Sequence, residues 1–209
     1  MIRAERAEGV LTLTLDRPEK ANSLTRAMLS GLLAELETVG EETRAVILTG
    51  AGKVFSAGAD LEEARAGLAT DPIWEAVSSR LAALPCLTVA ALNGTLAGGA
   101  FALALACDIR LAVPGAKVFY PVMKLGYLPQ PSDPARLAAL VGPGRARVIL
   151  MAGARIEAEE ALAWGLIDRL HAPEALQDAA RALAADPCAA PAGHVGRIKA
   201  MIPRAWSQG

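Results

Sequence analysis

The chain has 209 residues, 53% of them hydrophobic, and a formal net charge of -1 at pH 7. This length and hydrophobic content are enough to bury a full core. The near-zero charge argues against a nucleic-acid-binding protein, which presents a basic surface. The amino terminus lacks the apolar stretch of a secretory signal, so we expect a cytoplasmic protein. Cys86, Cys107 and Cys188 lie far apart in apolar surroundings, which favours buried free thiols over a disulfide or a metal site.

Strands and helices alternate along the first half of the chain. Leu11, Leu13 and Leu15 alternate with valine and threonine, which predicts a half-buried strand. The predicted strands are residues 2–6, 10–15, 44–50, 86–92 and 108–113. The predicted helices are residues 24–40, 61–67, 72–84 and 98–107. Because two of the strands are apolar throughout and helices separate them, we expect right-handed crossovers in a largely parallel sheet.

The chain becomes mainly helical after residue 120. The predicted helices are residues 133–141, 144–152, 158–164 and 173–185, with a weaker helical tail over 186–206. Residues 166–170 predict a short late strand. The apolar run from Leu87 to Cys107 is long enough to span a membrane, but glycines interrupt it twice. A strand, a turn and a buried helix fit this run better.

Three familiar motifs fail. In "TGAGK" the residue after Lys53 is valine, so the phosphate loop is incomplete, and "GTLAGGA" does not have the glycine spacing of a dinucleotide site. Ser56 lacks the flanking glycines of a nucleophile elbow. His171 and His194 lie far downstream, where surface or tail positions are the better interpretation.

Two glycine-containing turns remain. The strand "RAVILTG" leads to "SAGAD", and the strand "CLTVAAL" leads to "NGTLAGGA". If these strands are adjacent and parallel, both turns lie at the carboxyl edge of one sheet, where open α/β folds bind ligands. Two backbone N–H groups can then point at one oxygen, the second of them at the start of a helix. Such a pair stabilises a developing oxyanion.

Four motifs in order, "RPEKANSL", "VFSAGADL", "NGTLAGGAFALALACDIRLA" and "WGLID", resemble the enoyl-CoA hydratase/isomerase (crotonase) family. The resemblance runs from about Leu11 to Arg169. It implies a crotonase-like α/β fold of repeated ββα units, with parallel-rich sheets flanked by helices. We expect a core over residues 1–152 and a carboxyl-terminal helical region over 153–209, shortened relative to the family.

The resemblance also implies a site. The N–H groups of Ala59 and Gly99 would hold the thioester carbonyl of a coenzyme A substrate, and Gly98 would allow the tight entry into the helix. Close packing of helix on sheet is the alternative reason for these glycines. The residues expected to contact the substrate are Lys20, Ala21, Ser23, Ala57, Asp60, Leu61, Tyr120, Val122 and Tyr127. Coenzyme A is expected only as part of the substrate, and we expect no other cofactor and no metal. We also expect no nucleic-acid or membrane partner. Members of the family are usually trimers or dimers of trimers, so a homo-oligomer is implied.

Some charged residues have a structural interpretation as well. Asp60 can cap the helix that follows it, and Asp108 can fix the start of a strand. Lys53, Lys20 and Arg17 can meet coenzyme A phosphates or remain solvated surface charges.

The sequence departs from the family at both glutamates of its hydratases, which are replaced by Ala102 and Val122. Because hydration needs a base for the water and an acid for the carbon, we expect isomerisation or other enolate chemistry instead. Asp133 is a candidate acid, although "SDPARLAAL" reads more readily as an N-cap aspartate followed by proline. Tyr120 and Tyr127 can donate to the acyl group or only pack; Lys124 and Glu62 are weaker candidates.

A second departure is length. The family continues after "WGLID" with several helices, whereas this chain ends at Gly209. Either the oligomer is built differently or the acyl pocket is more open. Three functions stay open: an enzyme that forms an enolate-type intermediate on an acyl-CoA, a non-catalytic acyl-CoA-binding or regulatory relative, and a purely structural subunit.

Overall fold

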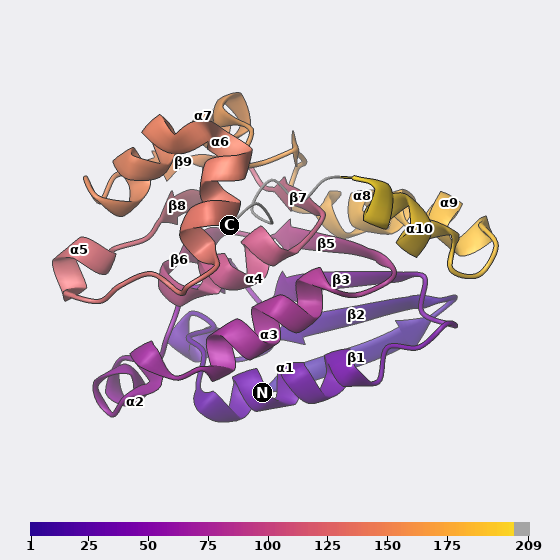
Figure 1. The fold of residues 1–209 in the computed structure, drawn as a ribbon, viewed down its shortest axis with the longest axis horizontal. Helices are drawn as coiled ribbons and strands as arrows, with labels where there is room; N and C mark the ends of the chain where they lie inside the picture. Colours follow the sequence, from indigo (N-terminus) through magenta and orange to yellow (C-terminus); the bar gives the residue numbers. More distant parts are fainter. Residues whose placement is uncertain (203–209) are drawn as a thin grey trace.

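The computed structural model describes residues 1–202 and contains two β-sheets flanked by helices (Figure 1). The larger sheet has the order β1-β2-β3-β5-β7-β10, and only the β1–β2 pair is antiparallel. Its strands are β1 (Ile2–Ala7), β2 (Val10–Leu15), β3 (Ala45–Gly50), β5 (Leu87–Leu92), β7 (Ile109–Ala112) and β10 (Arg169–Leu170). The prediction of adjacent parallel strands at residues 44–50 and 86–92 is confirmed, because β3 pairs with β5.

The smaller sheet has the order β4-β6-β8-β9, and its last pair is antiparallel. Its strands are β4 (Val54–Ser56), β6 (Thr95–Ala97), β8 (Lys117–Phe119) and β9 (Arg155–Glu157). These strands are not predicted from the sequence, because a segment of three residues is too short to show a period of two. Strand β4 lies in the segment that joins β3 to the first glycine-containing turn.

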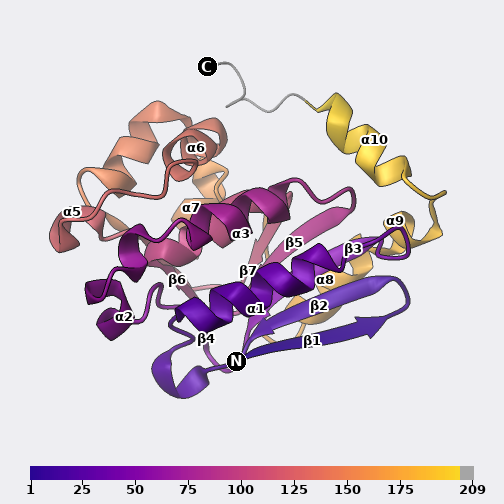
Figure 2. The same cartoon turned by 60° about the horizontal axis from the view of Figure 1, so that its bottom comes forward.

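Helices cover both faces of the larger sheet. Helices α1 and α3 lie side by side on one face, and α8 contacts β5 and β7 (Figures 1 and 2). The helices are α1 (Arg26–Glu37), α2 (Leu61–Arg65), α3 (Ile73–Ala82), α4 (Phe101–Ala106), α5 (Val122–Leu125), α6 (Asp133–Leu150), α7 (Ala158–Trp164), α8 (Leu176–Leu183), α9 (Ala185–Ala189) and α10 (His194–Met201). Three short 3-10 helices are η1 (Pro18–Lys20), η2 (Leu68–Thr70) and η3 (Gly98–Ala100).

Strand β2 is buried on both faces, so the expectation of a half-buried strand is wrong. The face that carries Thr12 and Thr14 is covered by the carboxyl-terminal helices. Gln177 of α8 donates a hydrogen bond to Oγ1 of Thr49 on the neighbouring strand (3.0 Å). Alternation of apolar and polar residues shows which face of a strand is more polar, but it does not show whether that face is exposed. Threonine, which is β-branched and suits a strand, can also lie on a face that other parts of the chain bury.

The carboxyl-terminal region contributes to both sheets. Beyond residue 152, β9 pairs with β8 and β10 pairs with β7, so this region supplies strands as well as helices. The predicted helices 133–141 and 144–152 form one element, α6, with a break at Gly142 (φ 80°). Within the predicted tail, α9 and α10 are helical, and residues 203–206 lie outside the described part of the chain.

The apolar run from Leu87 to Cys107 contains the predicted strand, β5, and the predicted buried helix, α4, and the unpredicted strand β6 and the 3-10 helix η3 lie between them. Across residues 1–202, no helix has the length and apolar character needed to cross a membrane. Cys86 and Cys107 are buried free thiols, as predicted, while Cys188 is half-buried and also free. Burial raises the pKa of Cys86 to about 11 and that of Cys107 to about 12, which keeps both thiols protonated.

The two sheets are joined by a close contact between two corners of the chain. The corner between β3 and β4 passes directly over the corner between β5 and β6. A Cβ atom on Gly94 would lie 2.0 Å from the carbonyl oxygen of Lys53. Asn93 fixes the same contact, because its Oδ1 accepts from the N–H of Gly50 (3.0 Å) and its Nδ2 donates to the carbonyl of Gly52 (2.9 Å).

We expect Gly94→Ala to lower the free energy of unfolding by about 3 kcal/mol, because the added methyl group would displace backbone in a packed corner. The control is Gly144→Ala in α6, where an added Cβ meets no atom within 4 Å. That variant should unfold at the same or slightly higher urea concentration, since alanine favours helix. Equal unfolding midpoints for the two variants would contradict the proposed contact.

Candidate active site

The two glycine-containing turns lie against each other. The turn after β4 contains Gly58 and the turn after β6 contains Gly98, and β4 and β6 are adjacent parallel strands. Both glycines have positive φ angles, 93° and 55°. A Cβ atom on Gly58 would lie 2.9 Å from the carbonyl oxygen of Ala97 and 3.2 Å from the nitrogen of Gly99. The turns are therefore delivered by the smaller sheet and pack backbone to backbone.

The amides of Ala59 and Gly99 make no hydrogen bond to an acceptor within residues 1–202. On either side of Ala59, the carbonyl of Gly58 accepts from the N–H of Leu24 (2.7 Å) and the N–H of Asp60 donates to the carbonyl of Leu24 (2.8 Å). Gly99 lies in the first turn of η3, where N–H groups have no acceptor within the helix. Both residues line one cavity, and the protein uses neither amide within residues 1–202.

Gly99 packs against an aromatic ring. A Cβ atom on Gly99 would lie 3.0 to 3.2 Å from the six-membered ring of Trp74. Trp74 is buried, and its Nε1 donates to the carbonyl of Leu68 (2.8 Å), which fixes the position of the ring. A glycine is therefore needed here for packing against helix α3 and not against the sheet, and this packing leaves the amide without a partner in the protein.

The cavity has a volume of about 250 Å³ and a mainly apolar wall. Its wall is formed by Ala57, Ala59, Leu61, Ala64, Arg65, Ala69, Trp74, Gly98, Gly99, Tyr120, Pro121, Val122, Leu125, Tyr127, Leu128 and Gln130. Within the described residues, no aspartate or glutamate lines it. Of the two positions where the sequence resemblance implies a missing glutamate, Val122 lines the cavity, whereas Ala102 is fully buried in α4 and does not line it.

Asp133 lies behind the cavity wall and does not cap a helix, so the N-cap expectation is wrong. Ser132 is the N-cap residue of α6 and Asp133 is already the first helical residue. The Asp133 carboxylate instead accepts a hydrogen bond from the hydroxyl of Tyr120 (3.0 Å), which in turn accepts one from the N–H of Gln130 (3.4 Å). Tyr120 and Gln130 line the cavity, and Asp133 reaches it only through them.

Burial is the main influence on the protonation of the Asp133 carboxyl group. It raises the pKa of Asp133 to about 7, while the hydrogen bond from Tyr120 and the positive charge of Arg136 act in the opposite direction and Glu75 adds to the increase. One carboxylate oxygen of Asp133, Oδ1, is buried with no hydrogen-bond partner in residues 1–202. Burial also raises the pKa of Tyr120, and the neighbouring Asp133 raises it further. Asp133 therefore exists in both protonation states near neutral pH.

Glu75 and Ser132 form a second polar cluster next to Asp133. Glu75 accepts hydrogen bonds from the hydroxyl and the N–H of Ser132 and from the hydroxyl of Ser79. Burial of Glu75 favours its neutral form, but these hydrogen bonds and the charge of Arg136 outweigh it and lower its pKa. Glu75 therefore stays ionised, and it does not line the cavity.

The loop expected to hold coenzyme A lies beside the cavity without lining it. Lys20 is exposed, the carbonyl of Ala21 accepts from the N–H of Ala57 (2.9 Å), and Ser23 accepts from Arg17 (3.2 Å). Asp60 caps α2 as expected, accepting from the N–H groups of the first turn, and it pairs with Arg17 at 2.8 Å. The Arg17 hydrogen bond is the main reason that the pKa of Asp60 is lowered, so Arg17 acts as a structural residue.

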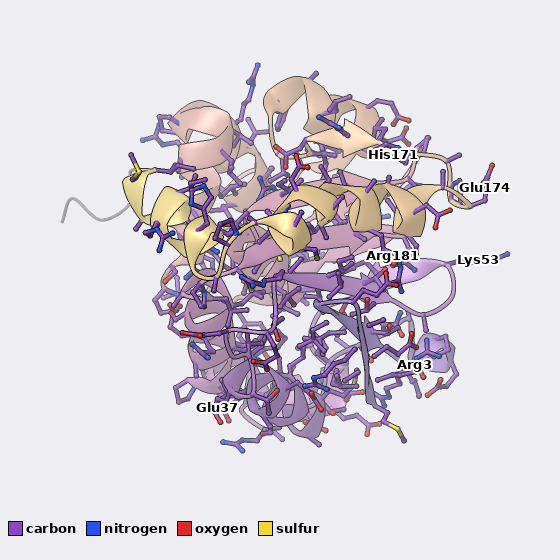
Figure 3. All side chains as sticks on the ribbon, turned by 90° about the vertical axis from the view of Figure 1, so that its right-hand side faces the viewer. Arg3, Glu37, Lys53, His171, Glu174 and Arg181 are labelled. Carbon is purple, nitrogen blue, oxygen red and sulfur yellow. The ribbon has the colours of Figure 1, made fainter. Side chains whose placement is uncertain are left out.

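The structure also places the other charged residues and the contact residues expected from the sequence. The carboxylate of Asp108 accepts from the N–H and hydroxyl of Thr88, which fixes the start of the β5–β7 pair as predicted. Lys53 projects into solvent from its loop, and the half-buried His171 lies close to α8 (Figure 3). Among the expected contact residues, the cavity is lined by Ala57, Leu61, Tyr120, Val122 and Tyr127.

The sequence analysis assigned no role to Asn22, Trp74 or Gln130. Asn22 is fully buried at a positive φ of 52° and organises the loop, donating to the carbonyls of Ala51 (2.8 Å) and Val54 (2.7 Å). The motif "RPEKANSL" could have indicated this role, because asparagine adopts the left-handed backbone region more readily than most residues. Trp74 and Gln130 gave no signal, since their role depends on contacts with distant segments.

The profile of the family described as "Enoyl-CoA hydratase/isomerase" matches residues 5–208. The chain is 40% identical over 187 residues to the putative enoyl-CoA hydratase/isomerase YngF of Bacillus subtilis, covering 85% of this chain and 72% of that protein. It is 34% identical over 206 residues to the 1,2-epoxyphenylacetyl-CoA isomerase of Escherichia coli, covering 93% and 79%.

Solved structures show the same architecture. The structure of Pseudomonas aeruginosa DspI superposes with a TM-score of 0.91 at 31% identity, covering 99% of this chain and 88% of that one. An enoyl-CoA hydratase from Mycobacterium smegmatis superposes with a TM-score of 0.88 at 31% identity, covering 96% and 81%. The fold is therefore crotonase-like, as the sequence resemblance implied, and the chain belongs to the enoyl-CoA hydratase/isomerase family.

Proposed function

We propose that the chain binds an acyl-CoA thioester in this cavity and stabilises an enolate-type oxyanion with the N–H groups of Ala59 and Gly99. The observation that carries the proposal is that both amides border one apolar cavity and neither is used by the protein within residues 1–202. Two relatives are named for acting on coenzyme A esters, an isomerase and a carnitinyl-CoA dehydratase.

The chemistry follows from where charge develops. Removal of a proton from the carbon next to the thioester places negative charge on the carbonyl oxygen, where the two amides would donate. Each fixed donor of this kind contributes roughly 3 kcal/mol to the stability of the transition state. The apolar wall strengthens the effect, because charges interact more strongly where water is excluded.

Isomerisation or related enolate chemistry is favoured over hydration. Adding water requires one group to deprotonate the water and another to protonate carbon. The cavity offers no carboxylate for either task among the described residues, and Val122 is apolar where the family's hydratases have an acid. A double-bond shift requires only that one proton leaves one carbon and returns to another.

Tyr120 and Asp133 are the groups that we assign to proton movement. Tyr120 lines the cavity, and Asp133 acts through it by a 3.0 Å hydrogen bond, which makes Asp133 a positioning residue. Because the pKa of Asp133 is about 7, the pair can hold or release a proton at neutral pH. Tyr127 lines the cavity as well.

Coenzyme A would lie along two segments, Lys20–Ser23, which does not line the cavity, and Ala57–Leu61, which forms part of its wall. Their proximity supports this placement, since the N–H of Ala57 donates to the carbonyl of Ala21. Assembly into a homo-oligomer, as in the family, is part of the same proposal.

A second function, acyl-CoA binding without turnover, is favoured by one observation. Efficient members need a group that moves protons, and the described cavity wall has tyrosines but no carboxylate. The two functions differ in turnover and share the binding step.

We expect Gly99→Ala to lower kcat/KM for conversion of a 3-enoyl-CoA into its 2-enoyl isomer by roughly a hundredfold. The added methyl group would meet the Trp74 ring at 3.0 Å and shift the amide. The assay is ultraviolet absorbance of the conjugated product, and Gly144→Ala is the control expected to keep wild-type activity. Wild-type protein that binds the ester but does not convert it would support the non-catalytic function instead. Equal rates for the two variants would contradict the role of the amide.

The raised pKa of Asp133 predicts a dependence of stability on pH. The folded carboxyl has a pKa of about 7, whereas an aspartate in an unfolded chain titrates near about 3.9. The folded chain therefore binds more protons between these values. Through this group, stability falls as the pH rises across that interval and is constant above it.

Asp133→Asn removes this titration. The difference in unfolding free energy, wild type minus variant, should decrease by about 1.4 kcal/mol per unit as the pH rises from about 4.5 to about 6.5. Urea denaturation at a series of pH values measures it. Asp178→Asn, at an exposed position on α8, is the control for the loss of one carboxyl group elsewhere on the chain. A difference for Asp133→Asn that changes with pH no more than that of the control would contradict the assigned protonation.

A further inference from the structure

We propose that the cavity selects acyl groups that end in a carboxylate, and that Arg65 binds this carboxylate. The inference deepens the proposed function and rests on the binding of an acyl-CoA at the same site. Arg65 is the last residue of α2 and lines the cavity. Of the cavity-lining side chains that the structure describes, it is the one that carries a formal charge at neutral pH.

Arg65 differs from the other arginines of this region in having no counter-ion. Arg17 pairs with Asp60 at 2.8 Å, and Arg26 pairs with Asp71 at 2.8 Å. Arg65 forms no ion pair with any of residues 1–202. The acids of these two pairs, Asp60 and Asp71, are already engaged, so Arg65 is left as a positive charge at the cavity.

The remaining acids near the cavity do not compensate this charge. Glu63 accepts from the backbone N–H of Arg26 (2.7 Å), and Glu75 accepts from Ser132. Asp133 lies behind Tyr120 and is partly neutral near pH 7. A guanidinium beside an apolar wall attracts an anion more strongly than one in bulk water does, and its planar fork fits a carboxylate with two parallel hydrogen bonds. The missing anion would come with the ligand.

A coenzyme A ester offers two kinds of anion, its phosphates and any carboxylate on the acyl group. Of the two segments expected to hold coenzyme A, Lys20–Ser23 does not line the cavity, whereas Ala57, Ala59 and Leu61 of the other do. Arg65 lies one helical turn after Leu61 and shares the wall with Leu128 and Gln130, which belong to neither segment. Helix α2 and helix α5 lie at the same end of the molecule (Figures 1 and 2). Because of these neighbours we assign Arg65 to the acyl carboxylate, and the test below separates this anion from a phosphate.

The test compares two saturated esters of equal chain length, glutaryl-CoA and pentanoyl-CoA, by isothermal titration calorimetry. Neither has a double bond to shift, so binding is measured without isomerisation. Wild-type protein should bind glutaryl-CoA roughly three- to tenfold more tightly than pentanoyl-CoA, the range for a charge-assisted contact at a partly exposed site. Arg65→Gln should abolish this preference by weakening glutaryl-CoA alone. Arg65→Lys should keep part of it, because the charge remains and the fork is lost.

The matched control is Arg181→Gln, at an exposed arginine on α8 away from the cavity (Figure 3). It should leave both affinities unchanged. If Arg65→Gln weakens both esters equally, Arg65 contacts a coenzyme A phosphate and the inference is wrong. If wild-type protein binds both esters equally, the inference is also wrong, while the proposed function stands. If neither ester binds, the inference and the proposed function fail together.

Discussion

The structure depends on direct contact between bare backbone segments at two levels. At the lower level the corner at Gly94 lies on the carbonyl of Lys53, and at the upper level Gly58 lies on the turn that contains Gly98. Side chains at these positions would separate the smaller sheet from the larger one and the two turns from each other. The same contacts that join the sheets also place two unused amides at one cavity. Fold and site therefore have a common physical requirement, the absence of Cβ atoms along one line of contact.

Polar side chains hold the loop that completes this arrangement. Asn22 binds the backbone on both sides of the β3–β4 corner, and the Arg17–Asp60 pair ties the same loop to the start of α2. Buried hydrogen bonds of this kind contribute modestly when made and cost much more when one partner is missing. The loop is thus fixed before any ligand arrives, and the amide of Ala59 is positioned by the rigid segments around it.

Strands β2, β3 and β5 of the larger sheet and most helices could be predicted because their apolar residues extend over several positions, and each of these strands has six residues. The two turns were found for a different reason, since glycine at the start of an apolar helix is a local signal of close approach. The smaller sheet escaped prediction because each strand has only three residues. The cap expected at Asp133 was wrong because its carboxylate finds Tyr120, thirteen residues earlier, which no local pattern reveals. Burial of Thr12 and Thr14 depends likewise on helices more than a hundred residues later in the chain.

The brevity of the strands in the smaller sheet has a dynamic consequence. Each contributes few ladder hydrogen bonds, so this sheet opens at a lower free energy than the long central strands of the larger one. The turns at Gly58 and Gly98 follow strands of this sheet and are held by backbone contacts in the closed state, so they open together with it while the hydrophobic centre beneath them stays closed. Amide hydrogen exchange would then be faster in β4 and β6 than in β3 and β5, and an occupied cavity would slow it in β4 and β6 alone.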